Sequence, residues 1–310
     1  MRYGRWGKAA GLVALMTAAP AAQQVADTSF APAIERPAYE AGRGPRVAID
    51  EAHLNFHTAD GGYAPFAALL RRDGYQVHSS RDPFTAGSLA RADILVVANA
   101  MHQQSENDWA PLPNLPAFTD QEVAAVEAWV RAGGSLLLIA DHMPLAGHAE
   151  TLAAAFGVRF QNGFAQDAAG NGLLTFRRSD RSLASNAITD GRTAGERVET
   201  VMTFTGQAFR VDPGVNAEPL LVLPAGSRLL LPEVAFRFSD RTPRIPAAHL
   251  LQGAIVRHGR GRVALLGEAA MLTAQLAGPD KQPMGMNAPG ARDNARFALN
   301  LLHWLSGVLP

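Results

Sequence analysis

Two uninterrupted apolar runs, separated by a helical pattern, constrain the fold of this chain more than any other feature. Residues 94–98 and 136–140 contain no polar side chain, which is typical of strands that are covered on both faces in a parallel sheet. Between them, Thr119 and Glu122 match a capping box, and three valines then recur on one helical face. This order predicts an α/β fold with a parallel sheet and helices on both faces.

Further elements repeat the same alternation along the chain. Apolar positions at spacings of three and four predict helices, and short apolar runs predict strands. The expected elements are a strand at 47–49, a helix at 63–72, a strand at 75–77, a short helix that stops at Gly157, a hairpin at 254–266 whose second arm rejoins the main sheet, and a helix at 291–306.

Composition indicates a folded chain with a sizeable core. Of the 310 residues, 47% are hydrophobic and 18% are charged, which is a globular composition. We expect an N-terminal arm at 23–45 and a single α/β domain at 46–309, with a β-rich insertion at about 160–251. Within that insertion the pattern predicts short strands at 198–204, 220–223 and 234–238.

The first residues have the three parts of a secretory signal. Arg2, Arg5 and Lys8 precede an apolar stretch at 9–19, and small residues close it at 19–22. The apolar stretch is shorter than the roughly 20 residues that span a bilayer. We therefore expect a cleavable signal peptide at 1–22 and a periplasmic or secreted protein, which meets the membrane only through this signal. The alternative is an uncleaved membrane anchor.

Composition also excludes several classes of function. Lys and Arg together number 28, as do Asp and Glu, so no excess positive charge favours nucleic acid. The chain has no cysteine, which excludes thiol nucleophiles, zinc–thiolate sites and iron–sulfur clusters. Its two lysines, Lys8 and Lys281, are not part of a P-loop. We infer no nucleotide or flavin cofactor, and the absence of a G-x-S-x-G motif argues against an α/β-hydrolase serine.

Polar side chains follow the expected strands at the points where they end. In an open parallel sheet these ends share one edge, and ligands bind there. Five of the nine histidines fall in these loops. The residues are Asp50, Glu51, His53, Asn55 and His57 after the first strand, Asn99 and His102 after the next, Asp141, His142 and His148 after the third, and Glu268 after the last.

This clustering predicts a hydrolytic site at the edge, with a divalent metal as a possible cofactor. Imidazole and carboxylate suit zinc or iron, which would lower the pKa of bound water to about 7. The predicted metal ligands are His57, His102, Asp141, His142 and His148. The predicted catalytic residues are Asp141 and His142, with Glu51 or Glu268 as general base. The predicted substrate-binding residues are His53, Asn55, Asn99 and Trp109.

Each of these residues also has a purely structural interpretation. An aspartate at a strand end often caps the next turn, and a single histidine is often a surface or hydrogen-bonding residue. Glu268 could equally be a cap or pair with an arginine. Trp109 opens a segment with three prolines at 109–118, which we expect to be a surface loop or lid.

Four segments together carry a family resemblance. They are DEAHLNFH at 50–57, GGSLLLIADH at 133–142, GEAA at 267–270, and the tail at 294–307. The chain resembles an uncharacterised bacterial domain-of-unknown-function family in the class I glutamine amidotransferase-like superfamily. The resemblance covers most of 46–309 and implies a flavodoxin-like sheet.

The resemblance also restricts the chemistry. In true amidotransferases of that fold a cysteine occupies the tight turn after a central strand. The matching turn here is Ala140-Asp141-His142, so glutamine hydrolysis through a thioester is excluded. The turn is distantly similar to that of trehalose-utilisation-type proteins, which implies a sugar-related ligand near His142.

These observations lead to one hypothesis and two alternatives. The leading hypothesis is an exported hydrolase-like enzyme that acts on a small molecule or carbohydrate with a His/Asp site. The first alternative is a non-catalytic periplasmic domain that binds carbohydrate or peptide in the same loops. The second is a partner of an envelope or transport complex.

Overall fold

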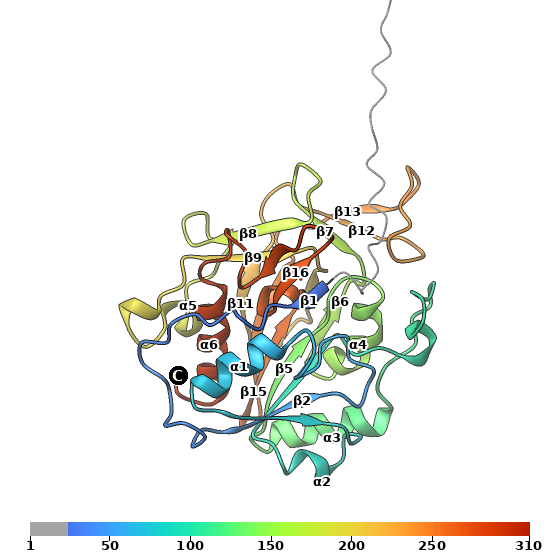
Figure 1. Cartoon of the computed structure of the whole chain (residues 1–310). Coiled ribbons are helices and arrows are strands. Elements are labelled where there is room, and N and C mark those ends of the chain that lie inside the picture. The colour runs from blue at the N-terminus through green and yellow to red at the C-terminus, as the bar shows by residue number, and fades with distance from the viewer. Residues whose placement is uncertain (1–23) are drawn as a thin grey trace, which may run out of the picture.

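A central sheet of nine strands organises the molecule (Figure 1). The computed structural model describes residues 24–310. Five strands are mutually parallel and lie in the order β3-β2-β4-β5-β15. Their bounds are β2 Arg46–Asp50, β3 Gln76–Ser80, β4 Ile94–Ala98, β5 Ser135–Ile139 and β15 Gly261–Leu266.

Antiparallel strands extend the sheet beyond β15. Strand β14 (Leu251–His258) forms a hairpin with β15, and it pairs in turn with β10 and β11. Strand β6 pairs antiparallel with β10 at the far edge. The bounds of these three strands are β6 Val158–Phe160, β10 Phe209–Val211 and β11 Ala217–Val222. The molecule is therefore a mixed α/β structure whose central sheet is mostly parallel.

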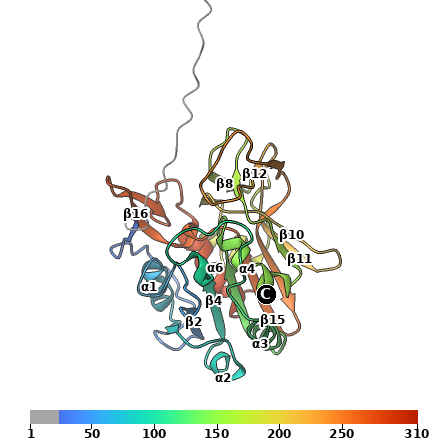
Figure 2. The same ribbon diagram turned by 90° about the vertical axis from the view of Figure 1, so that its right-hand side faces the viewer.

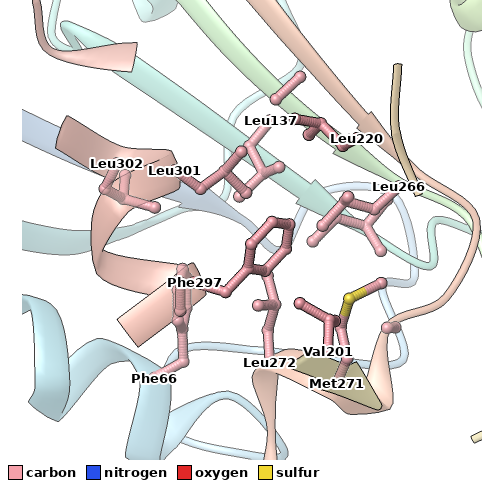
Figure 3. Packing of buried hydrophobic residues seen from close by; sticks show 14 of the residues in the cluster. Phe66, Leu137, Val201, Leu220, Leu266, Met271, Leu272, Phe297, Leu301 and Leu302 are labelled. Carbon is pink, nitrogen blue, oxygen red and sulfur yellow. The ribbon is translucent and has the colours of Figure 1, made fainter. Parts of the chain in front are cut away.

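Helices cover both faces of this sheet. On one face, α1 (Ala64–Arg72) and α6 (Asn294–Leu305) pack their apolar side chains against the strands. Figure 3 shows Phe297 of α6 among Phe66 and Leu137 in this cluster. The other face is covered by α2 (Ala86–Leu89), α3 (Asp120–Arg131) and α4 (Leu145–Ala154). Burial on both faces explains why the parallel strands are continuously apolar.

Three small sheets and a short helix lie around this layer (Figures 1 and 2). Strand β1 (Gln24–Ala26) pairs with β16 (Ala274–Ala277), which pairs with β17 (Gln282–Gly285). A second sheet combines β7 (Phe164–Gln166), β12 (Arg228–Leu230) and β13 (Arg244–Pro246), and a third pairs β8 (Leu173–Arg177) with β9 (Thr200–Phe204). Helix α5 spans Ala187–Asp190.

Most of the expected elements are confirmed. The strand at 94–98 is found with the expected bounds, and Thr119 and Glu122 make the reciprocal hydrogen bonds of a capping box. The hairpin at 254–266 is present, and its second arm pairs parallel with β5. The segment 109–118 contains no helix or strand, in agreement with the predicted loop.

One expectation was wrong. Residues 234–238 form a turn and not a strand, and Phe236 adopts a φ of 62° there. Two features were not expected. Helix α4 begins at Leu145, earlier than the apolar pattern indicated, so His148 lies in its first turn. The N-terminal arm contributes β1 to a sheet, and an edge strand of three residues is too short for a pattern of alternating polarity to be recognised.

The predicted signal peptide at 1–22 lies outside the described residues. Across residues 24–310, helix length and hydropathy never reach what a membrane-spanning helix needs. The domain boundaries remain predictions.

Candidate functional site

The loops that follow β2, β4 and β5 are in contact at the carboxyl ends of the strands. The side-chain oxygen of Asn99 accepts a hydrogen bond from the backbone N–H of Asp141 at 2.9 Å. The carbonyl of Asn99 accepts from the N–H of Phe56, and Met101 donates to the carbonyl of His53. Asn99 has a φ of 56°, a left-handed conformation that asparagine tolerates better than most residues. This turn brings the three loops together.

Asp141 and His142 lie at the centre of this edge and both reach solvent. The Nδ1 atom of His142 lies 2.8 Å from the carbonyl oxygen of Met143, so Nδ1 carries the proton and Nε2 is an acceptor. Nε2 lies 4.0 Å from a carboxylate oxygen of Asp141, and the two side chains are 14% and 10% exposed. The ring also stacks on Phe164, with centroids 4.5 Å apart. The pair therefore places a carboxyl group and an imidazole acceptor nitrogen, both partly exposed, at this edge.

Glu268 lies beside Asp141 but is fully buried. Its carboxyl oxygens accept hydrogen bonds from the N–H groups of Ala270 and Met271, both at 2.7 Å. Burial, and then the charge of Asp141, raise the pKa of Glu268 well above its usual value. The N–H of Ala269 also donates to Asp141 at 3.4 Å. The structure thus places Glu268, whose raised pKa favours the protonated carboxyl, next to the more exposed carboxyl group of Asp141.

Aromatic side chains pack around the ring of His142. We call Trp109, Phe164 and Phe236 the aromatic cluster. The rings of Trp109 and Phe236 meet that of His142 edge-on, with centroids 6.5 and 4.8 Å away. Sequence analysis missed Phe164 and Phe236, because nothing in their local pattern links either residue to the loop after β5.

In the loop after β2, unlike the loop after β5, the histidine is bonded to carboxyl groups on both ring nitrogens. His53 is hydrogen-bonded on one ring nitrogen to Asp50 at 2.9 Å and on the other to Glu122 at 2.9 Å. Its ring packs against both Phe84 and Phe118, with centroids 4.4 and 4.8 Å away. Burial lowers the pKa of His53, but the two carboxylates outweigh it and the net shift is upward. Both ring nitrogens of His53 are therefore occupied by hydrogen bonds within the protein.

Glu51 is also held by protein groups. It accepts hydrogen bonds from the N–H of Ala59, the hydroxyl of Ser79 and the guanidinium of Arg81, at 2.7–3.0 Å. Burial alone would raise the pKa of Glu51, but these donors lower it. A carboxylate bonded in this way is a weak base, and the general base expected from sequence is better sought elsewhere.

His57 and Asn55 are buried in the loop that follows β2. The ring of His57 stacks on Tyr63 with centroids 4.8 Å apart, and burial lowers the pKa of His57 to about 3. Within residues 24–310, Nδ1 of His57 and Nδ2 of Asn55 are buried without a hydrogen-bond partner. The hydroxyl of Tyr63 donates to the carbonyl of Ala269, which connects this region to the loop that carries Glu268.

His102 and His148 form a separate group with Ser105. The ring centroids of the two histidines are 6.5 Å apart. His148 bonds through Nε2 to Ser105 Oγ and through Nδ1 to the carbonyl of Leu115. Burial lowers the pKa of His148. The sequence contained no motif that would single out Ser105.

The predicted metal ligands do not form one ligand set. They occupy three places: His57 on Tyr63, His102 with His148, and Asp141 with His142. Among residues 24–310, no group of three or more His, Asp or Glu side chains is arranged to hold a metal ion.

Comparison with known proteins supports the fold. No protein-family model matches the sequence, and a search of curated proteins found no match. The solved structure of the mmIFT52 N-terminal domain is similar, with a TM-score of 0.58, 13% identity and coverage of 84% of this chain and 97% of that one. This similarity shows a shared fold.

Two other solved structures have lower scores. The cytoplasmic protein STM3548 from Salmonella typhimurium has a TM-score of 0.47 and 12% identity. The match covers 84% of this chain and 99% of the STM3548 chain. A protein described as ThuA-like, from Bacteroides uniformis, has a TM-score of 0.46 and 13% identity, with coverage of 89% and 94%.

Proposed function

We propose that this chain is an exported protein that binds a small carbohydrate at the carboxyl edge of its sheet. The observation that carries the proposal is the combination of Asp141 and His142, both partly exposed, with the aromatic cluster beside them. Carboxylate and imidazole acceptors suit sugar hydroxyls, and aromatic faces suit the apolar faces of sugar rings.

The sheet order supports the placement of this site. Numbered along the chain, the five parallel strands lie in the order 2-1-3-4-5, which is the order of a flavodoxin-like sheet. In such sheets ligands bind beyond the carboxyl ends of the strands. A flavodoxin-like fold with a β-rich insertion, related to the amidotransferase-like superfamily, is part of the proposal.

Calorimetric titration of the mature chain with neutral mono- and disaccharides tests the proposal. Saturable binding should weaken at least ten-fold in Asp141→Asn, His142→Ala and Trp109→Ala. His78→Ala, an exposed histidine on β3, is the matched control and should bind as the parent does. Binding that is unaffected by all three substitutions would place the ligand elsewhere, and no binding by any sugar would reject the proposal.

A second candidate is hydrolysis of the bound carbohydrate. The observation that favours it is the carboxyl pair of Asp141 and Glu268, since glycoside hydrolysis uses one protonated and one ionised carboxyl. Binding ranks first because Glu268 has no exposed surface. Turnover of aryl glycosides that Glu268→Gln abolishes would establish hydrolysis, and binding without turnover would exclude it.

A further inference from the structure

Ser105 and His148 form a hydrogen-bonded pair that the carbohydrate site does not use. Ser105 Oγ lies 2.8 Å from Nε2 of His148, whose Nδ1 lies 2.6 Å from the carbonyl oxygen of Leu115. Because a carbonyl oxygen can only accept, Nδ1 carries the proton and Nε2 accepts the hydroxyl proton of Ser105. In this arrangement an imidazole can act as the base for a serine nucleophile.

Neighbouring groups hold the pair in place. Ser105 ends a short 3-10 helix that His102 caps, since Nδ1 of His102 accepts a hydrogen bond from the N–H of Gln104 at 3.1 Å. The N–H of Ala110 donates to Ser105 Oγ at 3.3 Å. His102 therefore carries its own proton on Nε2.

A pocket of about 520 Å³ adjoins this pair. Three residues of its wall are direct neighbours of the pair. Gln104 precedes Ser105 in the chain, the N–H of Ala110 donates to Ser105 Oγ, and the carbonyl of Leu115 accepts a hydrogen bond from Nδ1 of His148. Neither Ser105 nor His148 lines the pocket, and Ser105 is 4% exposed, so an acyl carbon has to pass these three wall residues to reach its Oγ. The volume is within the range of small-molecule pockets.

The rest of the wall is mostly apolar. Trp109, Pro111, Leu112, Pro113 and the charged Asp108 line the pocket, and Leu112 is 51% exposed. The apolar part of this lining suits a hydrocarbon chain. The lining therefore selects esters of apolar carboxylic acids among the substrates that a serine nucleophile can attack.

We propose that Ser105 and His148 hydrolyse esters of apolar carboxylic acids bound in this pocket. Ser105 Oγ forms a bond to the acyl carbon while its proton passes to Nε2 of His148. The bond from the acyl carbon to the alkoxy oxygen breaks, and the leaving alcohol takes that proton. Water then attacks the acyl-serine, giving one proton to His148, and Ser105 recovers it as the acid departs. The carbonyl of Leu115 holds the imidazole ring in orientation throughout.

Labelling with a fluorophosphonate, followed by peptide mapping, tests the nucleophile in the full chain. We expect covalent labelling of Ser105 and hydrolysis of p-nitrophenyl hexanoate. Both should fall at least 100-fold in Ser105→Ala. Ser88→Ala, whose hydroxyl bonds to Thr85 and Pro83 without a histidine, should keep both. Labelling of the parent chain no greater than that of Ser105→Ala would overturn the proposal.

A thiol at the same place separates catalysis from a merely structural hydrogen bond. Because the chain has no cysteine, Ser105→Cys introduces a single thiol. Alkylation by iodoacetamide should show a thiol pKa below the ordinary value of about 8.5, and adding His148→Gln should return it toward that value. Ser88→Cys is the control. A thiol pKa that is the same with and without His148 would contradict the pairing of residue 105 with His148.

These results are independent of the proposed carbohydrate binding. The ester and labelling assays contain no sugar, and the calorimetric titrations contain no ester. Failure of one assay set therefore rejects one proposal and leaves the other standing.

Discussion

The loops after β2 and β5 begin with similar residues, but their histidines differ in the hydrogen bonds that their ring nitrogens make. Each places an aspartate at or just after the end of a buried strand and a histidine within the next three residues: Asp50 with His53, and Asp141 with His142. In the first loop both ring nitrogens of the histidine bond to carboxylates. In the second, one nitrogen bonds to the carbonyl of Met143 and the other lies 4.0 Å from Asp141, with the side chain partly exposed.

The difference depends on a residue from elsewhere in the chain. Glu122, 69 positions after His53, closes the first loop from helix α3. Around His142 the surrounding side chains are instead aromatic, from Phe164 and Phe236. The same local signal in the sequence thus gives a histidine bonded to two carboxylates at one strand end and a partly exposed Asp–His pair at the other.

The largest predicted difference between the two loops is the loss of unfolding free energy when the histidine of each loop is removed. His53→Ala leaves the fully buried carboxylate of Asp50 without its partner, which should cost about 3–5 kcal/mol of unfolding free energy. His142→Ala removes a partly exposed ring and should cost about 1–2 kcal/mol. Urea unfolding measures both. Equal costs would mean that the two loops do not differ as described.

Adding a methyl group tests how tightly the first loop is packed. A Cβ at Gly62 would lie 2.4 Å from Nδ1 of His57, whose buried ring stacks on Tyr63. Gly62→Ala should therefore cost about 1–3 kcal/mol. Gly87→Ala is the control, because its nearest neighbour would be 3.8 Å away in helix α2, and it should be neutral or stabilising by up to about 1 kcal/mol. Similar melting temperatures for both variants would refute this packing.

The pH dependence of stability should report the carboxylate that closes the first loop. Burial raises the pKa of Glu122, but the N–H of Thr119 and the ring of His53 outweigh it and lower the pKa to about 2. A depressed carboxyl pKa stabilises the fold above the unfolded value of 4.5, and this contribution is lost as pH falls toward 2. Urea unfolding between pH 5 and pH 2 should be less pH-dependent in Glu122→Gln. If the unfolding free energy of Glu122→Gln falls with pH as steeply as that of the parent and of the exposed control Glu106→Gln, Glu122 is not coupled to folding.

Local patterns predicted much of the sheet but not the state of its loops. The strand at 94–98 and the capping box at Thr119 depend on neighbouring residues only, and both were found. The role of Glu122 as a partner of His53 depends on how α3 packs, so the capping pattern could not reveal it. Ser105 likewise gains its partner from α4. Polar clustering indicated one edge of the sheet without showing which side chains remain exposed there.

Nitrogen-15 NMR of histidine-labelled protein, titrated with neutral mono- and disaccharides, tests the central claim most directly. If the loop after β5 is the open site, a sugar should shift the ring nitrogens of His142 saturably while those of His53 stay unchanged. Saturable shifts at His53 without any at His142, or no shift at His142 with any sugar, would contradict the account.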